Sequence, residues 1–229
     1  MLYLLDTADL NAIEELIRFY PISGVTTNPT ILAKNGRKDL KSLFLNIRKI
    51  IGNERSLHIQ ALGKDSSTIV NEAKLLSELL GENTFIKIPV MREGIKAILE
   101  IKKQKIKIGI TATGIMSPQQ ALIAGVSGAH FVAPYINRSD NHNEDGAKMV
   151  SDIKTLFEIN KIDSKILGAS FKNVKQIQDT MLAGSNSITV DPSLFERLIY
   201  HSITDLSIAD FKKDWESLFD KNKTLLDSL

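Results

Sequence analysis

The run FIKIPV at positions 85–90 places a lysine inside an apolar, strand-forming segment. Lysine is rarely buried unless it is paired or functional. Burial favours the neutral amine, because the charged form loses its hydration, and a neutral amine can form a Schiff base with a carbonyl substrate. The alternative is a strand-end lysine whose head group reaches solvent. Lys87 is therefore the candidate nucleophile of a metal-free aldol reaction.

Polar side chains also end several other strand-forming runs. Six of them could surround such a nucleophile: Asp6, Thr26, Asn28, Gln60, Thr111 and Tyr135. A glutamine can hold a water or a hydroxyl, and a phenol can donate or accept a proton. Structural roles stay open for three of them, because Asp6 and Asn28 could cap the following helices and Tyr135 could pack at a rim.

A second group of residues could bind phosphate. Arg138, Ser170 and Lys172 follow the sixth and seventh strand-forming runs, next to the region where many β/α barrels bind phosphate. Arginine can grip a phosphate through two hydrogen bonds, and backbone N–H groups at a helix N-terminus can add to them. Either basic side chain alone could equally be a solvated surface group, so their joint placement carries the prediction.

Metal chemistry has little support in the sequence. The histidines His58, His130, His142 and His201 are scattered, without an H-x-x-x-H pair. There is no cysteine, which excludes disulfides, thiolate zinc sites and cysteine nucleophiles. We therefore expect no metal and no other cofactor, and we expect His58 to be a hydrogen-bonded interior residue.

Strand and helix patterns alternate along the chain. Eight strands are predicted, at Leu2–Asp6, Gly24–Thr27, Leu57–Ala61, Thr84–Pro89, Lys107–Thr111, His130–Pro134, Lys165–Ser170 and Ser187–Val190. Apolar spacings of three and four predict helices at Leu10–Phe19, Leu40–Ile51, Thr68–Leu80, Gly94–Lys103, Gln119–Ala124, Gly146–Ile159 and Val174–Leu182. Alternation predicts parallel strands with right-handed crossovers.

Eight such units close most simply into an α/β fold with a single eight-stranded TIM barrel. The rival is an open doubly wound sheet, which is weakened because no G-x-G-x-x-G follows the first strand. In a barrel, alternate strand residues face the interior, and catalytic groups gather at the carboxyl ends of the strands. Lys87 would face the axis, and Ile86 and Ile88 would face the helices.

The chain continues past the eighth strand into IADFKKDWESLF. Its apolar residues fall on one helical face, at Ile208, Phe211, Trp215, Leu218 and Phe219. We expect an extra C-terminal helix at about residues 205–220. It could pack on its own barrel or on a neighbouring subunit. No linker or low-complexity segment interrupts the chain, so a single domain over residues 1–229 is predicted.

The composition excludes several classes of protein. The 229 residues are 43% hydrophobic, which suits one domain with a substantial core. A net charge of +2, with acids and bases mixed, argues against a nucleic-acid or membrane-surface protein. No apolar run approaches the roughly 20 residues of a transmembrane helix. The N-terminus has no basic lead of a signal peptide, so a cytoplasmic protein is expected.

Five segments resemble the transaldolase family, above all its small members, which include fructose-6-phosphate aldolases. The segments are LDTAD at 5–9, GVTTNPTILAK at 24–34, FIKIPV at 85–90, VAPYINR at 132–138 and ASFKN at 169–173. They occur in the family's order and span nearly the whole chain. The resemblance implies a β/α barrel whose Schiff-base lysine lies on the fourth strand, at Lys87.

The resemblance also implies roles for other residues and for the C-terminal helix. Asp6 and Asn28 would line the site, Gln60, Thr111 and Tyr135 would surround the catalytic water and the proton-transfer position, and Arg138 and Ser170 would hold the substrate phosphate. Small members commonly form pentamers and decamers in which the C-terminal helix reaches a neighbour. This favours a homo-oligomer.

Two positions divide the family. Transaldolases proper carry glutamate and phenylalanine where this chain has Gln60 and Tyr135, whereas the aldolase members carry glutamine and tyrosine. The segment TATGIMSPQQ after the fifth strand is about two residues longer than in close relatives, which leaves open whether residues such as Thr113 border the substrate.

The expected function is a class I aldolase that cleaves and forms fructose 6-phosphate from dihydroxyacetone and glyceraldehyde 3-phosphate. The first alternative is a transaldolase of the pentose phosphate pathway, which moves a dihydroxyacetone unit between sugar phosphates. A second is a catalytically idle barrel that binds sugar phosphates. The buried amine of Lys87 argues against that reading, because a binding protein has no need of it.

Overall fold

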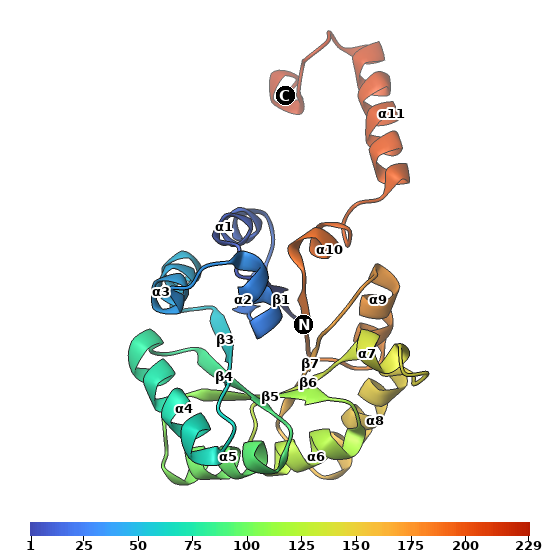
Figure 1. Cartoon of the computed structure of the whole chain (residues 1–229). Coiled ribbons are helices and arrows are strands. Elements are labelled where there is room, and N and C mark those ends of the chain that lie inside the picture. Colours follow the sequence, from blue (N-terminus) through green and yellow to red (C-terminus); the bar gives the residue numbers. More distant parts are fainter. The chain divides into compact units, whose positions relative to one another are not determined.

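The computed structural model describes all residues, 1–229. Eight parallel strands form a closed barrel in which each strand pairs with the next and β8 pairs with β1 (Figure 1). The strands are β1 (Leu2–Asp6), β2 (Ile22–Thr26), β3 (Ser56–Gln60), β4 (Thr84–Pro89), β5 (Gly109–Ile115), β6 (Phe131–Pro134), β7 (Lys165–Gly168) and β8 (Ser187–Val190). The predicted TIM barrel is confirmed, and the open doubly wound sheet is excluded.

Nine helices lie between the strands in sequence and outside them in space, and a tenth follows β8 (Figure 1). They are α1 (Leu10–Phe19), α2 (Pro29–Asn35), α3 (Leu40–Ile51), α4 (Ser66–Leu80), α5 (Arg92–Lys103), α6 (Pro118–Val126), α7 (Ile136–Asp140), α8 (Gly146–Ile159), α9 (Val174–Leu182) and α10 (Pro192–Glu196). Asn28-Pro29 and Asp191-Pro192, each a capping residue followed by a proline, mark the starts of α2 and α10 in the sequence, whereas nothing in the sequence marks the short α7.

Capping residues decide which polar groups remain for the barrel interior. Asp9 caps α1, because its side chain accepts hydrogen bonds from the backbone N–H groups of Asn11 and Ala12. Asp6 is therefore not the cap of that helix. Asn28 does cap α2, where it accepts from the N–H of Ile31.

The bounds of seven predicted strands agree with the structure to within two residues, and the fifth does not. The strand predicted at Lys107–Thr111 begins at Gly109 and continues to Ile115. The strand begins two residues later than predicted because Ile108 lies in a tight turn, in which its backbone N–H donates a hydrogen bond to the carbonyl of Ile106. It continues past Thr111 because Ala112 and Thr113 pair regularly with both neighbouring strands, and a β-bulge then carries it to Ile115.

The bulge lies in the β5–β6 pair. Thr113 pairs with Ala133, and the next paired residue, Ile115, faces Pro134. Gly114 between them has φ 72°, a left-handed conformation that glycine adopts without steric cost. Bulges bend a strand and re-aim its side chains, often beside active sites. The first five residues of the longer segment TATGIMSPQQ, Thr111–Ile115, therefore belong to the end of β5.

Apolar side chains fill the barrel on the amino-terminal side of Lys87. Leu4, Phe131, Ala133 and Leu167 form a buried cluster, and Phe85 packs against it. Ala133 and Leu167 of this cluster also form the floor of the cavity described below.

Residues 195–229 form a separate compact unit. It contains α11 (Ser202–Leu218) and a short 3₁₀ helix (Leu225–Asp227). Within it, the rings of Trp215 and Phe219 stack with centroids 4.4 Å apart, and the Trp215 indole N–H donates to the carbonyl of Lys223. The predicted helix at about 205–220 is thus observed. None of the helices has the length and apolar character needed to span a bilayer.

Candidate active site

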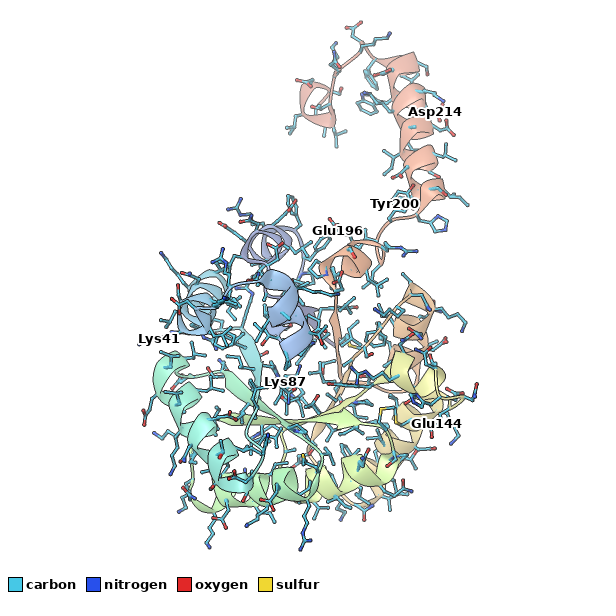
Figure 2. The ribbon with its side chains drawn as sticks, viewed as in Figure 1. Lys41, Lys87, Glu144, Glu196, Tyr200 and Asp214 are labelled. Atoms are coloured by element: carbon cyan, nitrogen blue, oxygen red, sulfur yellow. The ribbon has the colours of Figure 1, made fainter.

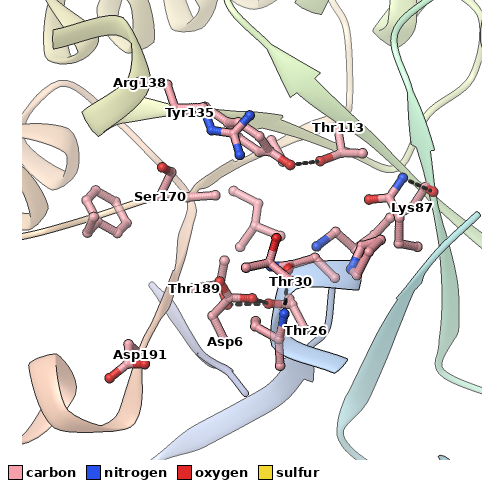
Figure 3. A pocket seen from close by; sticks show the side chains of 18 of the residues that line it. Asp6, Thr26, Thr30, Lys87, Thr113, Tyr135, Arg138, Ser170, Thr189 and Asp191 are labelled. Carbon is pink, nitrogen blue, oxygen red and sulfur yellow. Dashed lines mark hydrogen bonds between the residues drawn. The ribbon is translucent and has the colours of Figure 1, made fainter. Parts of the chain in front are cut away.

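A cavity of about 350 Å³ opens at the carboxyl ends of the barrel strands (Figure 3). The sequence predicted ten site residues, and nine of them line it: Asp6, Thr26, Asn28, Gln60, Lys87, Tyr135, Arg138, Ser170 and Lys172. The tenth, Thr111, lies in the core beneath and does not border the cavity. The nine come from strands β1 to β4 and from the segments that follow β2, β6 and β7, so only the closed barrel brings them together.

Lys87 lies inside the ring of strands and is only 5% exposed (Figure 2). Its amine donates a hydrogen bond of 2.8 Å to the backbone carbonyl of Thr27 and forms no ion pair with a carboxylate. Burial lowers the pKa of Lys87, and the charge of Asp6 opposes that shift. The amine is therefore held in place without being locked as a salt bridge, and it reaches its neutral form more easily than an exposed lysine does.

Asp6 lies at the end of a chain of hydroxyl groups. The Thr26 hydroxyl donates to the Asp6 carboxylate at 2.6 Å. Because Thr26 has one proton to give, the Thr189 hydroxyl must donate to Thr26 across the 2.6 Å between them. Burial raises the pKa of Asp6, whereas Lys87 and the Thr26 hydrogen bond lower it. Asp6 thus provides a shielded carboxyl group opposite the amine.

Gln60 presents one end of its amide to the cavity. Its Nε2 donates to the carbonyls of Lys87 at 3.2 Å and Ala61 at 3.3 Å. These bonds fix the side chain against β4 and leave Oε1 without a partner in the chain. The free oxygen can accept a hydrogen bond from a water or a substrate hydroxyl.

Tyr135 is fixed from two sides. Its phenol oxygen lies 3.0 Å from the hydroxyl of Thr113, and the guanidinium of Arg138 lies over its ring, 5.0 Å from the centroid (Figure 3). Its backbone N–H donates to the carbonyl of Ile115, the residue after the bulge. The phenol thus has a defined position at the cavity wall.

Thr111 has a different partner from the one expected of a site residue. Its hydroxyl lies 2.8 Å from Nδ1 of His58, and Nε2 of His58 lies 3.0 Å from the hydroxyl of Ser56. The imidazole also stacks on Phe85 at 4.4 Å. His58 is therefore the hydrogen-bonded interior residue that the sequence predicted, and burial lowers its pKa to about 3.

Basic groups dominate the outer part of the cavity. Arg138 and Lys172 lie on the β6–β7 side, and Lys34 comes from α2. Ser170 adopts φ 64° and accepts the backbone N–H of Asn137 through its carbonyl. Such a basic, open rim suits an anionic ligand such as a phosphate ester.

Five polar lining residues were not among the predicted site residues. They are Thr30, Lys34, Thr113, Thr189 and Asp191. Thr113 carried a signal, because it lies two residues after Thr111 and so on the same face of the strand, but the predicted strand stopped short of it. Thr189 lies near the end of the eighth strand and Asp191 directly follows it, where polar residues could also have been read as candidates.

One comparison with known proteins bears on this geometry. The sequence model of the family described as transaldolase/fructose-6-phosphate aldolase matches residues 3–227.

Proposed function

Because the chain belongs to the transaldolase/fructose-6-phosphate aldolase family, we propose that it is a Schiff-base aldolase. In this proposal it cleaves fructose 6-phosphate to dihydroxyacetone and glyceraldehyde 3-phosphate and catalyses the reverse reaction. One observation carries the proposal: the buried Lys87 amine, with a lowered pKa, borders the same cavity as the Tyr135 phenol.

The first step is covalent. The neutral amine of Lys87 attacks the C2 ketone of the sugar, and loss of water gives an iminium ion. The charge of Asp6 favours the cationic form of the Lys87 nitrogen, so it would also favour the iminium. The Thr27 carbonyl, which accepts from the free amine at 2.8 Å, orients the nitrogen before attack.

Bond cleavage follows from the electron demand of the iminium. A base removes the proton of the C4 hydroxyl, the C3–C4 bond breaks, and its electrons move toward the iminium to give an enamine. Glyceraldehyde 3-phosphate leaves. Tyr135, acting through a water held by the free oxygen of Gln60, is the candidate group for this proton transfer, and such assistance is worth about 10²–10⁴ in rate.

The fate of the enamine separates the two activities of the family. Protonation at C3, addition of water at C2 and loss of dihydroxyacetone restore the free amine. In a transaldolase the enamine instead attacks an aldose phosphate acceptor. A phenol at the cavity wall supports release, because it can deliver the proton; this favours the aldolase over the transaldolase alternative.

The basic rim supports a phosphorylated substrate. Arg138 and Ser170 would bind the phosphate, with Lys172 adding charge at the edge of the cavity. The Arg138 guanidinium lies over the ring of Tyr135, 5.0 Å from its centroid, and its planar fork of N–H groups suits paired hydrogen bonds to phosphate oxygens.

Assembly is part of the proposal. Several apolar residues of α11 are exposed in the single chain, among them Ile203, Leu206, Ile208, Phe211 and Leu218. Exposed apolar surface of this extent marks interaction sites. We expect α11 to pack on a second copy of this chain in a pentamer or decamer.

A coupled assay tests the reaction. Release of glyceraldehyde 3-phosphate from fructose 6-phosphate is followed with and without erythrose 4-phosphate. The proposal predicts release without the acceptor. If glyceraldehyde 3-phosphate forms only when the acceptor is present, the chain is a transaldolase.

A further inference from the structure

A second pocket, of about 620 Å³, lies at the opposite end of the barrel from the candidate active site. We call it the amino-terminal pocket, because it is lined by residues at the amino ends of β4, β6 and β7 and by the segments that precede β6 and β7. Its volume is within the range of small-molecule sites. The lining residues on which the argument depends are Phe85, Lys102, His130, Phe131, Lys161 and Lys165.

The rim of the amino-terminal pocket is basic. Lys102, Lys161 and Lys165 line it, against one acidic residue, Asp163. The ion pairs of the chain all involve other residues, so no carboxylate neutralises these lysines. Lys102 lies in the last turn of α5, where a lysine can simply complement the helix dipole. Lys165 begins β7, so no helix end accounts for it. Positive charge gathered around a concave surface attracts anions.

Packing and a backbone hydrogen bond place two of the donors at this pocket. The stem of Lys102 lies across Gly128, where an added Cβ would come within 3.1 Å of Cγ and Cε. Nδ1 of His130 accepts the backbone N–H of Ile110 at 3.0 Å, so the proton of the neutral ring lies on Nε2. His130 therefore offers an N–H donor in a fixed tautomer, beside the ammonium groups of the lysines.

Aromatic side chains form the floor of the amino-terminal pocket. The rings of Phe85 and Phe131 meet edge to face with centroids 5.3 Å apart, and His130 meets Phe85 in the same manner at 6.2 Å. The ammonium of Lys165 lies 6.0 Å from the centroid of the Phe131 ring. Positive charge and apolar surface are thus in contact. An anion that also carries an apolar group can use both, because the group leaves water on the aromatic floor.

We propose that the amino-terminal pocket is a binding site for a small phosphate ester whose other end is apolar. The phosphate lies among the three lysines, with the His130 N–H as a further donor, and the apolar group packs on Phe85 and Phe131. A phosphate monoester has three terminal oxygens and nearly two negative charges, which suits three lysines better than a carboxylate does. The site is separate from the candidate active site, since the two share no lining residue.

Titration of the full chain with two probes tests the assignment. Phenyl phosphate carries a dianion and an apolar ring, whereas inorganic phosphate carries the charge alone. Isothermal titration calorimetry is done in an Arg138→Ala background, which removes the candidate phosphate contact of the active site. In this background the doubly substituted chain Lys161→Ala/Lys165→Ala is compared with Lys103→Ala/Lys107→Ala. Lys103 and Lys107 are exposed, lie near the same end of the barrel and do not line the pocket, so this control loses the same charge.

We expect phenyl phosphate to bind about tenfold more tightly than inorganic phosphate, because its ring is buried on the aromatic floor. An exposed ion pair contributes roughly a two- to fivefold change in affinity. Lys161→Ala/Lys165→Ala should therefore weaken the binding of phenyl phosphate about tenfold, and the control should bind as the Arg138→Ala chain does.

Three results would overturn the assignment. One is that neither probe binds, and another is that inorganic phosphate binds as tightly as phenyl phosphate. The third is that the two doubly substituted chains bind alike. If the third result comes with a lower melting temperature in Lys161→Ala/Lys165→Ala than in the control, the lysines serve the stability of the barrel and not a ligand.

Discussion

The guanidinium of Arg138 lies over the ring of Tyr135, 5.0 Å from its centroid. Arg138 is the candidate for binding phosphate, and Tyr135 is the candidate for proton transfer. A phosphate that draws Arg138 into place would therefore also set the ring beneath it. This contact joins the binding and chemical parts of the site in one pair of side chains.

Loss of Arg138 should affect both parts. We expect Arg138→Ala to raise KM for fructose 6-phosphate about 10- to 100-fold, the range for hydrogen bonds to a charged group, and to lower kcat as well. Arg138→Lys should keep part of the charge attraction and lose the contact of the guanidinium with the Tyr135 ring, so it should recover KM better than kcat. Steady-state kinetics checks this, with Arg18→Ala, an exposed arginine on α1, as the control. Unchanged KM in Arg138→Ala would remove Arg138 from the phosphate site.

Asp6 should control the pH at which Lys87 becomes reactive. Burial lowers the pKa of Lys87, and the charge of Asp6 raises it. Asp6→Asn removes the negative charge that raises this pKa, so the pKa of Lys87 should fall further. Trapping should then remain fast at a lower pH than in the wild type. The measurement is the pH dependence of the trapping rate with dihydroxyacetone, with Asp163→Asn as a control outside the cavity. A shift to higher pH would contradict the assigned electrostatics.

His58 should make the fold sensitive to acid. Its pKa is about 3 in the folded chain and about 6.5 when exposed, so the unfolded state binds a proton first as the pH falls. As the pH falls from about 6.5 to about 3, the free energy of unfolding should therefore decrease, by up to about 1.4 kcal/mol per pH unit from this group. Urea unfolding at several pH values should show this extra slope in the wild type and in His142→Gln, and not in His58→Phe. Equal slopes in all three would exclude His58 as the cause.

The apolar face of α11 should determine the assembly state. Phe211 is 70% exposed on α11, and Phe19 on α1 is 74% exposed. We expect Phe211→Glu to shift the sedimentation coefficient of the full chain toward smaller species, because a charge would be buried in the subunit contact. Phe19→Glu serves as the matched control. An unchanged sedimentation profile for Phe211→Glu would exclude this face as the contact.

The barrel was predictable because its signals are local and repeated. Strand-forming runs such as Thr84–Pro89 and capping signals such as Asn28-Pro29 indicate where the strands and helices begin and end. Lys87 was predictable for a related reason, since a charged residue in a strand buried on both faces stands out from its neighbours.

Other parts of the site depend on pairings between distant residues. The contact between Thr113 and Tyr135 depends on how far β5 continues and on its register with β6, in which Thr113 pairs with Ala133 before the bulge at Gly114. The partner of Thr111 is likewise decided across the barrel, because His58 lies 53 residues earlier in the chain. A single sequence shows the residue types at these positions and not the register that selects among them.

The central claim is that the amine of Lys87 bonds covalently to the ketone of the substrate. Borohydride reduction in the presence of dihydroxyacetone, followed by peptide mass spectrometry, measures this directly. We predict the added mass on the peptide that contains Lys87, no label in Lys87→Ala, and a folded Lys87→Ala barrel without measurable turnover. An unmodified Lys87 in the wild type, or a label on another lysine, would contradict the claim.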